Sequence, residues 1–210
     1  MKAHVIAVVN LKGGSAKTTT SVFLAHSLGA TRRVMLVDAD PQGSALRWSG
    51  LADWPFPALG LSIGDLHRRL PGVIGDDYHV VVIDTPPLEE RANIVHSALR
   101  AAHVVVVPMA PTMMELDRVG PVRTAVEDVA SLRDGSLPVR VLLNRTVANA
   151  TSTDTVRQVL TEQGWHVLAA TVPRLERYAQ AFGASVPTDD EPYRAVADEL
   201  ADVAVMEASR

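Results

Sequence analysis

The sequence of 210 residues predicts an α/β protein in which a mainly parallel β-sheet is covered by helices on both faces. Short runs rich in β-branched residues recur along the chain, and they are continuously apolar, as expected for strands buried on both faces. Helix-like segments separate these runs, and such alternation produces parallel strands joined by right-handed crossovers. The sequence contains no repeat or linker that would divide it, so we expect residues 1–210 to form a single domain.

Six apolar runs are predicted to be strands, the last of them weaker than the rest: Val5–Val9, Val34–Val37, Val80–Ile83, Val104–Val107, Val139–Leu143 and Val167–Val172. Longer helices are predicted between or after them: Thr18–Leu28, Leu88–Ala101, Leu116–Leu132, Thr153–Gln163 and Pro192–Ala208. The connection between the second and third runs is the longest one. We expect it to hold two short helices, near Ser44–Trp48 and near Ile63–Leu70.

The composition excludes several classes of protein. A hydrophobic fraction of 47% with 21% charged residues indicates a folded core rather than a disordered chain. The absence of cysteine excludes disulfides, thiolate zinc sites, cysteine-held iron–sulfur clusters and a cysteine nucleophile. No run approaches the ~20 apolar residues that cross a bilayer, and the first run is too short for a signal peptide. We therefore expect a cytoplasmic protein.

Charge is unevenly distributed along the chain. The formal net charge is −4, but residues 189–210 alone contain seven acidic side chains and only two arginines. The rest of the chain is slightly positive, so a basic patch on the main body remains compatible with the composition. Only three of the 20 basic residues are lysines, and two of these, Lys12 and Lys17, share one glycine-containing stretch.

That stretch follows the first predicted strand and reads Asn-Leu-Lys-Gly-Gly-Ser-Ala-Lys-Thr-Thr-Thr over residues 10–20. A turn that leads from a strand into a helix leaves backbone N–H groups free, and the helix dipole favours an anion there. Gly13 and Gly14 permit close approach of a phosphate. Lys17 could reach the β- and γ-phosphates, and the Thr18 hydroxyl could bind Mg²⁺. Taken alone, the stretch could also be an ordinary glycine turn.

Carboxylates follow two further predicted strands. Asp38 and Asp40 come just after the second run, within Val-Asp-Ala-Asp-Pro-Gln-Gly-Ser, and Asp84 ends the third. These positions lie at the carboxyl edge of a parallel sheet, where such sheets bind ligands. Beside a triphosphate, the carboxylates could hold Mg²⁺ or orient an attacking water. Each segment alone could be structural, but the three segments in this order favour a nucleotide site.

The phosphate loop departs from the ordinary pattern, because the two expected glycines fall at Leu11 and Ala16. With a lysine directly before the glycine pair, it resembles the deviant loop of the ParA/MinD family of dimeric ATPases, whose fold is P-loop NTPase-like. Ala16 replaces the glycine that is usual in that family, which implies an altered loop geometry or affinity. The resemblance continues at residues 84–87, 108–112, 141–145 and 172–183.

The resemblance implies a role for each matching residue. Lys17 binds phosphates within its own subunit, Lys12 reaches across a dimer interface to the partner's ATP, and Asp40 positions the hydrolytic water. These three form the expected catalytic set. Mg²⁺ is expected at Thr18, Asp38 and Asp84. The expected nucleotide-binding residues are Lys12, Gly13, Gly14, Ser15, Ala16, Lys17, Thr18, Thr19, Asn144, Arg145 and Pro173, with the Asn144 amide pairing with adenine.

The resemblance is strongest to short ParA-type ATPases, which partition plasmids without an appended repressor domain. It implies ATP and Mg²⁺ as cofactors, a homodimer formed with ATP, a centromere-binding adaptor protein, and nonspecific DNA as a nucleoid-associated support. Candidate DNA contacts are Arg140, Arg145, Arg157, Arg174 and Arg177, each of which could instead be solvated or salt-bridged.

Three other functions stay open. A MinD-like membrane protein is disfavoured, because the C-terminal helix carries Glu199, Asp202 and Glu207 where an anionic lipid surface requires basic residues. A relative of ParA could position a chromosome or a protein assembly instead of a plasmid. A small-molecule kinase or ligase similar to dethiobiotin synthetase would use the same loop without needing Lys12 in a dimer.

Overall fold

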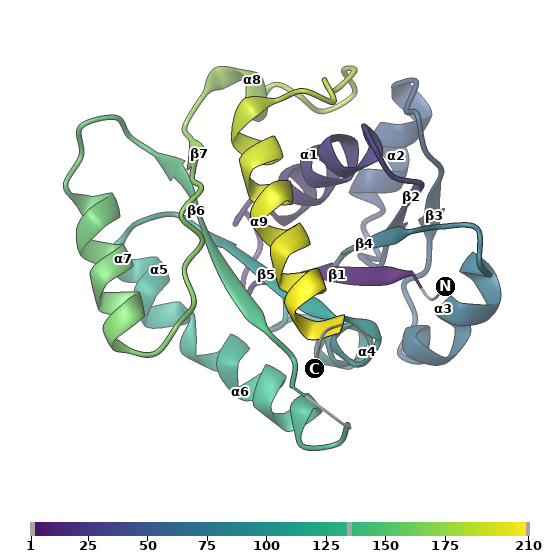
Figure 1. Ribbon diagram of the computed structural model, residues 1–210, viewed down its shortest axis with the longest axis horizontal. Helices are drawn as coiled ribbons and strands as arrows, with labels where there is room; N and C mark the ends of the chain where they lie inside the picture. Colours follow the sequence, from purple (N-terminus) through teal and green to yellow (C-terminus); the bar gives the residue numbers. More distant parts are fainter. Residues whose placement is uncertain (1–2, 134–135, 209–210) are drawn as a thin grey trace.

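The computed structural model describes residues 3–133 and 136–208, with side chains described up to residue 201. Within that part of the chain, seven parallel strands form one sheet in the order β3-β2-β4-β1-β5-β6-β7 (Figure 1). The strands are β1 His4–Val8, β2 Val34–Asp38, β3 Ala58–Gly60, β4 Val80–Asp84, β5 Val104–Met109, β6 Val139–Thr146 and β7 Val172–Pro173. The predicted fold class is therefore confirmed.

Helices cover both faces of the sheet. They are α1 Lys17–Gly29, α2 Ser44–Leu51, α3 Leu66–Ile74, α4 Ala92–Ala101, α5 Met113–Arg118, α6 Gly120–Ala130, α7 Ser152–Glu162, α8 Glu176–Ala179 and α9 Glu191–Ala208. Helices α1 and α9 pack against each other on one face, where α2 also lies. On the other face α4 packs between α3 and α6 (Figure 1).

The apolar runs form two core layers because side chains alternate across a strand. In β1, Ile6 and Val8 point into the layer under α1 and α9. Ala7 and Val9 point into the layer under α4 and α6. This explains why the runs are continuously apolar, since both faces of the sheet are covered.

The α2 helix is tied to a distant segment by Trp48. The Trp48 side chain is buried, and its indole Nε1 donates a hydrogen bond of 2.8 Å to the carbonyl oxygen of Ala184. The Trp48 ring also lies 5.9 Å from that of Phe182. The helix that follows Asp38 and Asp40 therefore packs on the loop between α8 and α9.

Several details differ from the sequence-based expectation. The predicted helix Leu116–Leu132 is two helices, α5 and α6, which meet at Val119 and Gly120 just before Pro121. The helix predicted from Leu88 begins only at Ala92; residues 88–90 form a turn instead, and the backbone N–H of Leu88 bonds to the Asn10 carbonyl of the phosphate loop.

Strand predictions were least accurate at the sheet edges. The run Val167–Val172 contributes only its last residue to β7, while Val167 makes an isolated bridge to Val141. The short edge strand β3 was missed altogether, since three residues are too few for a recognisable pattern. In the described part of the chain, none of the helices is long and apolar enough to span a membrane.

Candidate nucleotide-binding site

The predicted phosphate loop lies at the carboxyl edge of the sheet, between the end of β1 and the start of α1 at Lys17. The neighbouring strands β2 and β4 bring their last residues, Asp38 and Asp84, into direct register with each other. The segments that follow all of these strands therefore meet at one edge. This is where an open parallel sheet binds its ligand.

Two residues of the loop adopt the left-handed backbone region. Gly14 has a φ of +75° and Ala16 a φ of +67°. Glycine adopts this region freely, whereas an alanine there carries a steric cost of about 1–2 kcal/mol. The Ala16 carbonyl accepts the Thr20 N–H, which begins the hydrogen bonding of α1. Ala16 therefore keeps the backbone conformation of the glycine that it replaces, at a steric cost, and the predicted change of loop geometry or affinity stays a prediction.

Lys17 folds back over its own loop. Only 7% of the residue is exposed, and its Nζ donates a 2.9 Å hydrogen bond to the carbonyl oxygen of Lys12. Burial lowers the pKa of the Lys17 ammonium, and the nearby Asp84 carboxylate opposes that shift. A positive charge beside the backbone N–H groups of a loop at a helix N-terminus favours an anion there.

Asp84 is a buried carboxyl with unused hydrogen-bonding capacity. It is fully buried, and burial raises its pKa to about 7, with the neighbouring Asp38 carboxylate adding to the effect. Its Oδ1 lies 3.0 Å from the Ser21 hydroxyl, but within the described residues its buried Oδ2 has no hydrogen-bond partner. Such an oxygen fits a hard cation such as Mg²⁺. Asp84 is one of the three residues predicted to hold the metal; Asp38 lies beside it in register, and Thr18 lies in the first turn of α1.

The other two carboxylates are used differently. Asp38 is buried, which raises its pKa, and its two oxygens accept backbone N–H groups of Asp40 at 3.1 Å and of Leu46 at 2.8 Å. Asp38 therefore shapes the turn that leads into α2. Asp40 is only partly buried and accepts the Gln42 N–H at 2.9 Å. It is the more accessible carboxylate of the two.

The second loop lysine lies apart from the first. Lys12 is partly exposed, and its Nζ forms an ion pair of 3.3 Å with Glu89. The segment after β4 reaches the loop through backbone bonds from Leu88 and Glu89 to the carbonyls of Asn10 and Leu11. Lys12 and Lys17 therefore have separate environments, one at the surface and the other buried.

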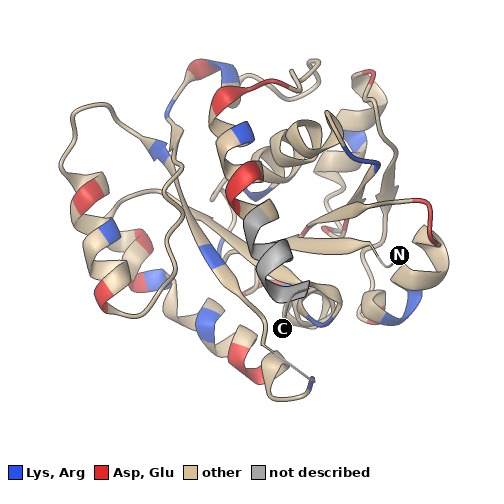
Figure 2. Cartoon of the chain, in the orientation of Figure 1, with Lys and Arg blue, Asp and Glu red and all other residues tan. Residues whose placement is uncertain are grey.

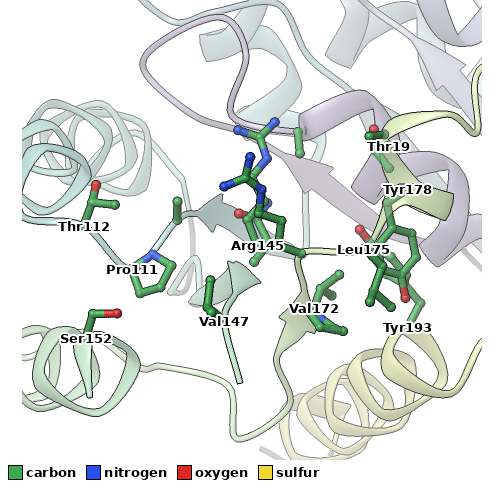
Figure 3. Close-up of a pocket in the computed structure, with 16 residues that line it drawn as sticks. Thr19, Pro111, Thr112, Arg145, Val147, Ser152, Val172, Leu175, Tyr178 and Tyr193 are labelled. Carbon is green, nitrogen blue, oxygen red and sulfur yellow. The ribbon is translucent and has the colours of Figure 1, made fainter. Parts of the chain in front are cut away.

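A cavity of about 720 Å³ adjoins the loop (Figure 3). The predicted base-binding residues Asn144, Arg145 and Pro173 all line it, together with Ala16 and Thr19. In Figure 3, Arg145 lies between a wall that contains Tyr178 and Tyr193 and a wall that contains Pro111 and Thr112. The cavity is large enough for a nucleoside.

Asn144 joins this cavity to the phosphate loop. Its Nδ2 donates to the carbonyl oxygen of Ser15 at 3.1 Å, and within the described residues its buried Oδ1 has no partner. Arg145 follows with a φ of +53°, at an irregularity in the pairing of β6 with β7. The strand end that was predicted to bind the base is therefore distorted, which is typical of ligand sites.

Sequence reasoning missed several residues of the cavity region, among them Tyr193 and Asp190. Tyr193 lines the cavity, while Asp190 is buried and binds Tyr178, which lines it. The available signal for Asp190 was its position directly before Glu191 and Pro192, a pattern typical of a helix N-cap. That pattern predicts a helix start but no contact with a ligand site.

The predicted DNA-contacting arginines do not form one cluster. Arg140 lies near the start of β6, at the opposite end of that strand from Arg145. Arg157 on α7 donates to the backbone carbonyls of Leu168 and Ala169. In Figure 2, acidic and basic residues are interspersed along α6, α7 and α9.

The remaining two arginines lie near the cavity. Arg174 is exposed and lines the cavity. Arg177 pairs with Asp190 at 3.2 Å and lies over the Tyr178 ring.

The acidic C-terminal segment is partly structural. Glu199 was named as one of the acidic residues that disfavour an anionic lipid surface, and its carboxylate accepts the backbone N–H groups of Ala169 and Ala170. Asp190 is buried as well. The side chains of Asp202 and Glu207 lie outside the described residues. Two of the acidic groups therefore hold segments of the fold together and do not form a free acidic surface.

Comparison with known proteins gives a family match over most of the chain. The model of the CobQ/CobB/MinD/ParA nucleotide binding domain matches residues 6–187. Maintenance of carboxysome distribution protein A of Halothiobacillus neapolitanus is 31% identical over 95% of this chain and 94% of its own length. The protein of that name from Gloeobacter kilaueensis is 42% identical, but over only 54% of this chain and about half (52%) of its own length. The chromosome-partitioning ATPase Soj of Thermus thermophilus is 29% identical over 95% of this chain and 96% of its own.

Solved structures agree on the fold. Apo McdA of Cyanothece superposes with a TM-score of 0.79 at 17% identity, covering 95% of this chain and 100% of that one. Cobyrinic acid a,c-diamide synthase of Mycobacterium smegmatis superposes with a TM-score of 0.78 at 26% identity, covering 100% of this chain and 98% of that one. That structure contains an ATP analog and magnesium, the two ligands that the loop and carboxylates predict.

Proposed function

This chain belongs to the CobQ/CobB/MinD/ParA family of nucleotide-binding domains, and on that premise we propose that it is a slow, ATP-timed switch. It dimerises when it holds ATP and Mg²⁺ and separates after hydrolysis. The observation that carries the proposal is the pair of lysines on one loop. Lys17 is buried against its own phosphate site, whereas Lys12 is partly exposed and so available to a second subunit.

Each group at the site has a distinct chemical task. The backbone of residues 13–19 and the Lys17 ammonium bind the phosphates. Thr18, Asp38 and Asp84 would hold Mg²⁺, which would supply positive charge to offset that of the phosphates. Asp40, the accessible carboxylate, orients the water whose oxygen attacks the γ-phosphorus. The bond from that phosphorus to the β–γ bridging oxygen breaks, and ADP and phosphate leave.

Lys12 couples dimerisation to the state of the nucleotide. A lysine supplied by the second subunit neutralises charge on the γ-phosphate, which ATP carries and ADP lacks. Hydrolysis removes this contact, so the dimer loses stability when the reaction is complete. The protein would then work as a switch between an ATP-bound dimer and separated subunits, and not as an enzyme that supplies a product.

The proposed task is to position a cargo. In the version expected from short ParA-type ATPases, the ATP dimer binds nonspecific DNA of the nucleoid, and a centromere-binding adaptor on a plasmid or chromosome stimulates hydrolysis. In the second version the cargo is a protein assembly. The match to a carboxysome distribution protein over 94% of that protein's length supports the second version. Both versions share the ATP-driven cycle in the cytoplasm.

The test combines assembly with turnover. The mass of the purified protein is measured by light scattering with ADP and with ATP, each with Mg²⁺. The ATPase activity of the protein is then measured without additions, with nonspecific DNA, with the protein product of an adjacent small gene, and with both. We expect a dimer with ATP only, and slow turnover that the adaptor and DNA stimulate together. A monomer under all conditions contradicts the proposal.

A different enzyme class provides the second candidate. The likeness to cobyrinic acid a,c-diamide synthase favours an ATP-dependent ligase, in which an acceptor binds beside the γ-phosphate. A small-molecule kinase or ligase of this kind would turn over without DNA or a protein partner. Its rate would rise with a metabolite, and the Lys12→Ala variant would keep full activity.

A further inference from the structure

The buried carboxylate of Asp190 joins α8 and α9, the helices that carry Tyr178 and Tyr193. These two tyrosines line one side of the cavity and are called the aromatic wall below. Asp190 precedes α9, and its side chain is only 3% exposed. The Tyr178 hydroxyl of α8 lies 2.9 Å from Asp190 Oδ1 and 3.2 Å from Oδ2. The Arg177 guanidinium, also on α8, lies 3.2 Å from Oδ2. Asp190 thus contacts two side chains of α8, Tyr178 and Arg177.

Tyr178 is held on its other side by α1. Its ring packs edge-on against Phe23, with centroids 5.0 Å apart, and lies 5.6 Å from the ring of Tyr193. Burial raises the pKa of the Tyr178 hydroxyl to about 12, so it is a neutral donor to Asp190 at any physiological pH. Tyr178 and Tyr193 both line the cavity. The position of this wall therefore depends on the Asp190 contacts.

An ordinary N-cap role accounts for only part of this arrangement. Asp190 Oδ1 accepts the Tyr193 N–H at 3.3 Å, as an N-cap does in the first turn of a helix. A cap requires no bond to Tyr178 or Arg177, which lie on a separate element. Helix α8 has only four residues, too few to be stable without tertiary contacts. Asp190 supplies such contacts.

We propose that Asp190 is a positioning residue for the nucleoside half of the nucleotide. It orders α8 and the Tyr178 ring before the ligand arrives, so that binding does not have to order them. The phosphate half is bound by residues 13–19, which Asp190 does not touch. This inference rests on the proposed function, because it assigns the cavity to the adenosine of ATP.

The test separates the two halves of the ligand. Dissociation constants for ATP and for inorganic tripolyphosphate are measured by titration calorimetry with Mg²⁺, beside a thermal melt of each variant. Asp190→Ala removes all the contacts, and Tyr178→Phe removes only the hydroxyl. We expect ATP binding to weaken about 3–10-fold in both, with tripolyphosphate binding unchanged. Asp190→Asn keeps an acceptor and a good N-cap and should restore part of the loss.

Controls distinguish this effect from general ones. Asp198→Ala removes an exposed acidic residue from the same helix and should leave both affinities unchanged. Equal weakening of ATP and tripolyphosphate, or unchanged ATP binding in folded variants, overturns the inference. Should Asp190→Ala fail to fold, the Tyr178→Phe variant decides. A wild-type protein that binds no ATP overturns the proposed function as well, whereas ATP binding that is indifferent to both variants overturns only the role of Asp190.

Discussion

The Lys12 ammonium lies 3.3 Å from the Glu89 carboxylate, and the two side chains are 42% and 39% exposed. The backbone of Glu89 is also bonded to the carbonyl of Leu11, so the segment after β4 rests on the phosphate loop. The lysine proposed to act on a partner's ATP is therefore paired within its own chain. Exposed ion pairs are weak, so this one exchanges readily for a stronger anion.

Replacement of Lys12 should separate dimerisation from nucleotide binding. We expect Lys12→Ala to abolish the ATP-dependent dimer while part of the ATP affinity remains, because Lys17 and the backbone of the loop are intact. Gel filtration with ATP and Mg²⁺ measures the first effect and calorimetry the second. A Lys12→Ala protein that still elutes as a dimer with ATP contradicts the role in the partner's site.

Replacement of Glu89 should have the opposite effect. Glu89→Gln removes the competing carboxylate, so we expect dimerisation at up to about five-fold lower ATP concentration, the limit set by a surface pair of up to about 1 kcal/mol. Glu90→Gln is the matched control, since Glu90 is the exposed neighbour and has no ion pair with Lys12. Equal shifts in both variants would indicate a general charge effect.

Replacement of Asp40 should slow ATP hydrolysis and leave ATP binding and dimerisation intact. We expect Asp40→Ala to bind ATP and to dimerise, but to hydrolyse ATP at least about 100-fold more slowly, because the water is no longer oriented. Phosphate release under single-turnover conditions measures the rate, and the dimer should persist for correspondingly longer. Wild-type turnover in this variant excludes Asp40 as the group that positions water.

The buried Asp84 carboxyl should destabilise the folded protein when no ligand is bound. Its pKa is raised from 3.8 to about 7 by burial, so the ionised form is disfavoured in the folded protein. We expect Asp84→Asn to raise the melting temperature of the nucleotide-free protein by about 4–8 °C, on the order of 2 kcal/mol, while Mg²⁺-dependent ATP binding is lost.

The pH dependence gives the control for this prediction. Below pH 4 the carboxyl is protonated in both the folded and the unfolded chain, so the advantage of Asp84→Asn should vanish. It should grow between about pH 4 and pH 7, where only the unfolded chain is ionised, and stay constant above that range. A difference that does not change with pH contradicts the buried-charge explanation.

The strained alanine of the loop gives a prediction about stability. Ala16→Gly removes the steric cost of a φ of +67° but adds chain entropy to the unfolded state, so we expect a net gain of about 0.5–1 kcal/mol. Gly14→Ala is the reciprocal variant, with a φ of +75° and nothing within 4 Å of the added methyl group. It should lose a similar amount in urea unfolding.

The sequence predicted the parts of the site that depend on local pattern. Loop residues from Lys12 to Thr19 and the strand-end residues Asp38, Asp84 and Asn144 lie at one edge of the sheet. Buried strands are visible as apolar runs, and their carboxyl ends must share an edge when the strands are parallel.

The remaining features depend on contacts between distant segments. Glu89 meets Lys12, and Asp190 meets Tyr178, only because the chain folds back on itself, and no local periodicity encodes such pairs. The structural role of the acidic residue Glu199 was missed for the same reason, since its partners are backbone N–H groups of another segment. Charge patterns along a helix identify polar residues without identifying what they bind.

The hydrogen bond from the Trp48 indole to the Ala184 carbonyl allows the contact between α2 and the loop before α9 to be followed by fluorescence. The indole of Trp48 is buried and hydrogen-bonded to the loop beside the aromatic wall, whereas Trp165 lies elsewhere, against Arg123. With Trp54→Phe and Trp165→Phe, the emission of Trp48 alone would report any displacement of α2 from that loop. Because the chain has no cysteine, one introduced thiol would carry an acceptor dye without background labelling. The successive steps of the nucleotide cycle could then be timed in a single stopped-flow trace.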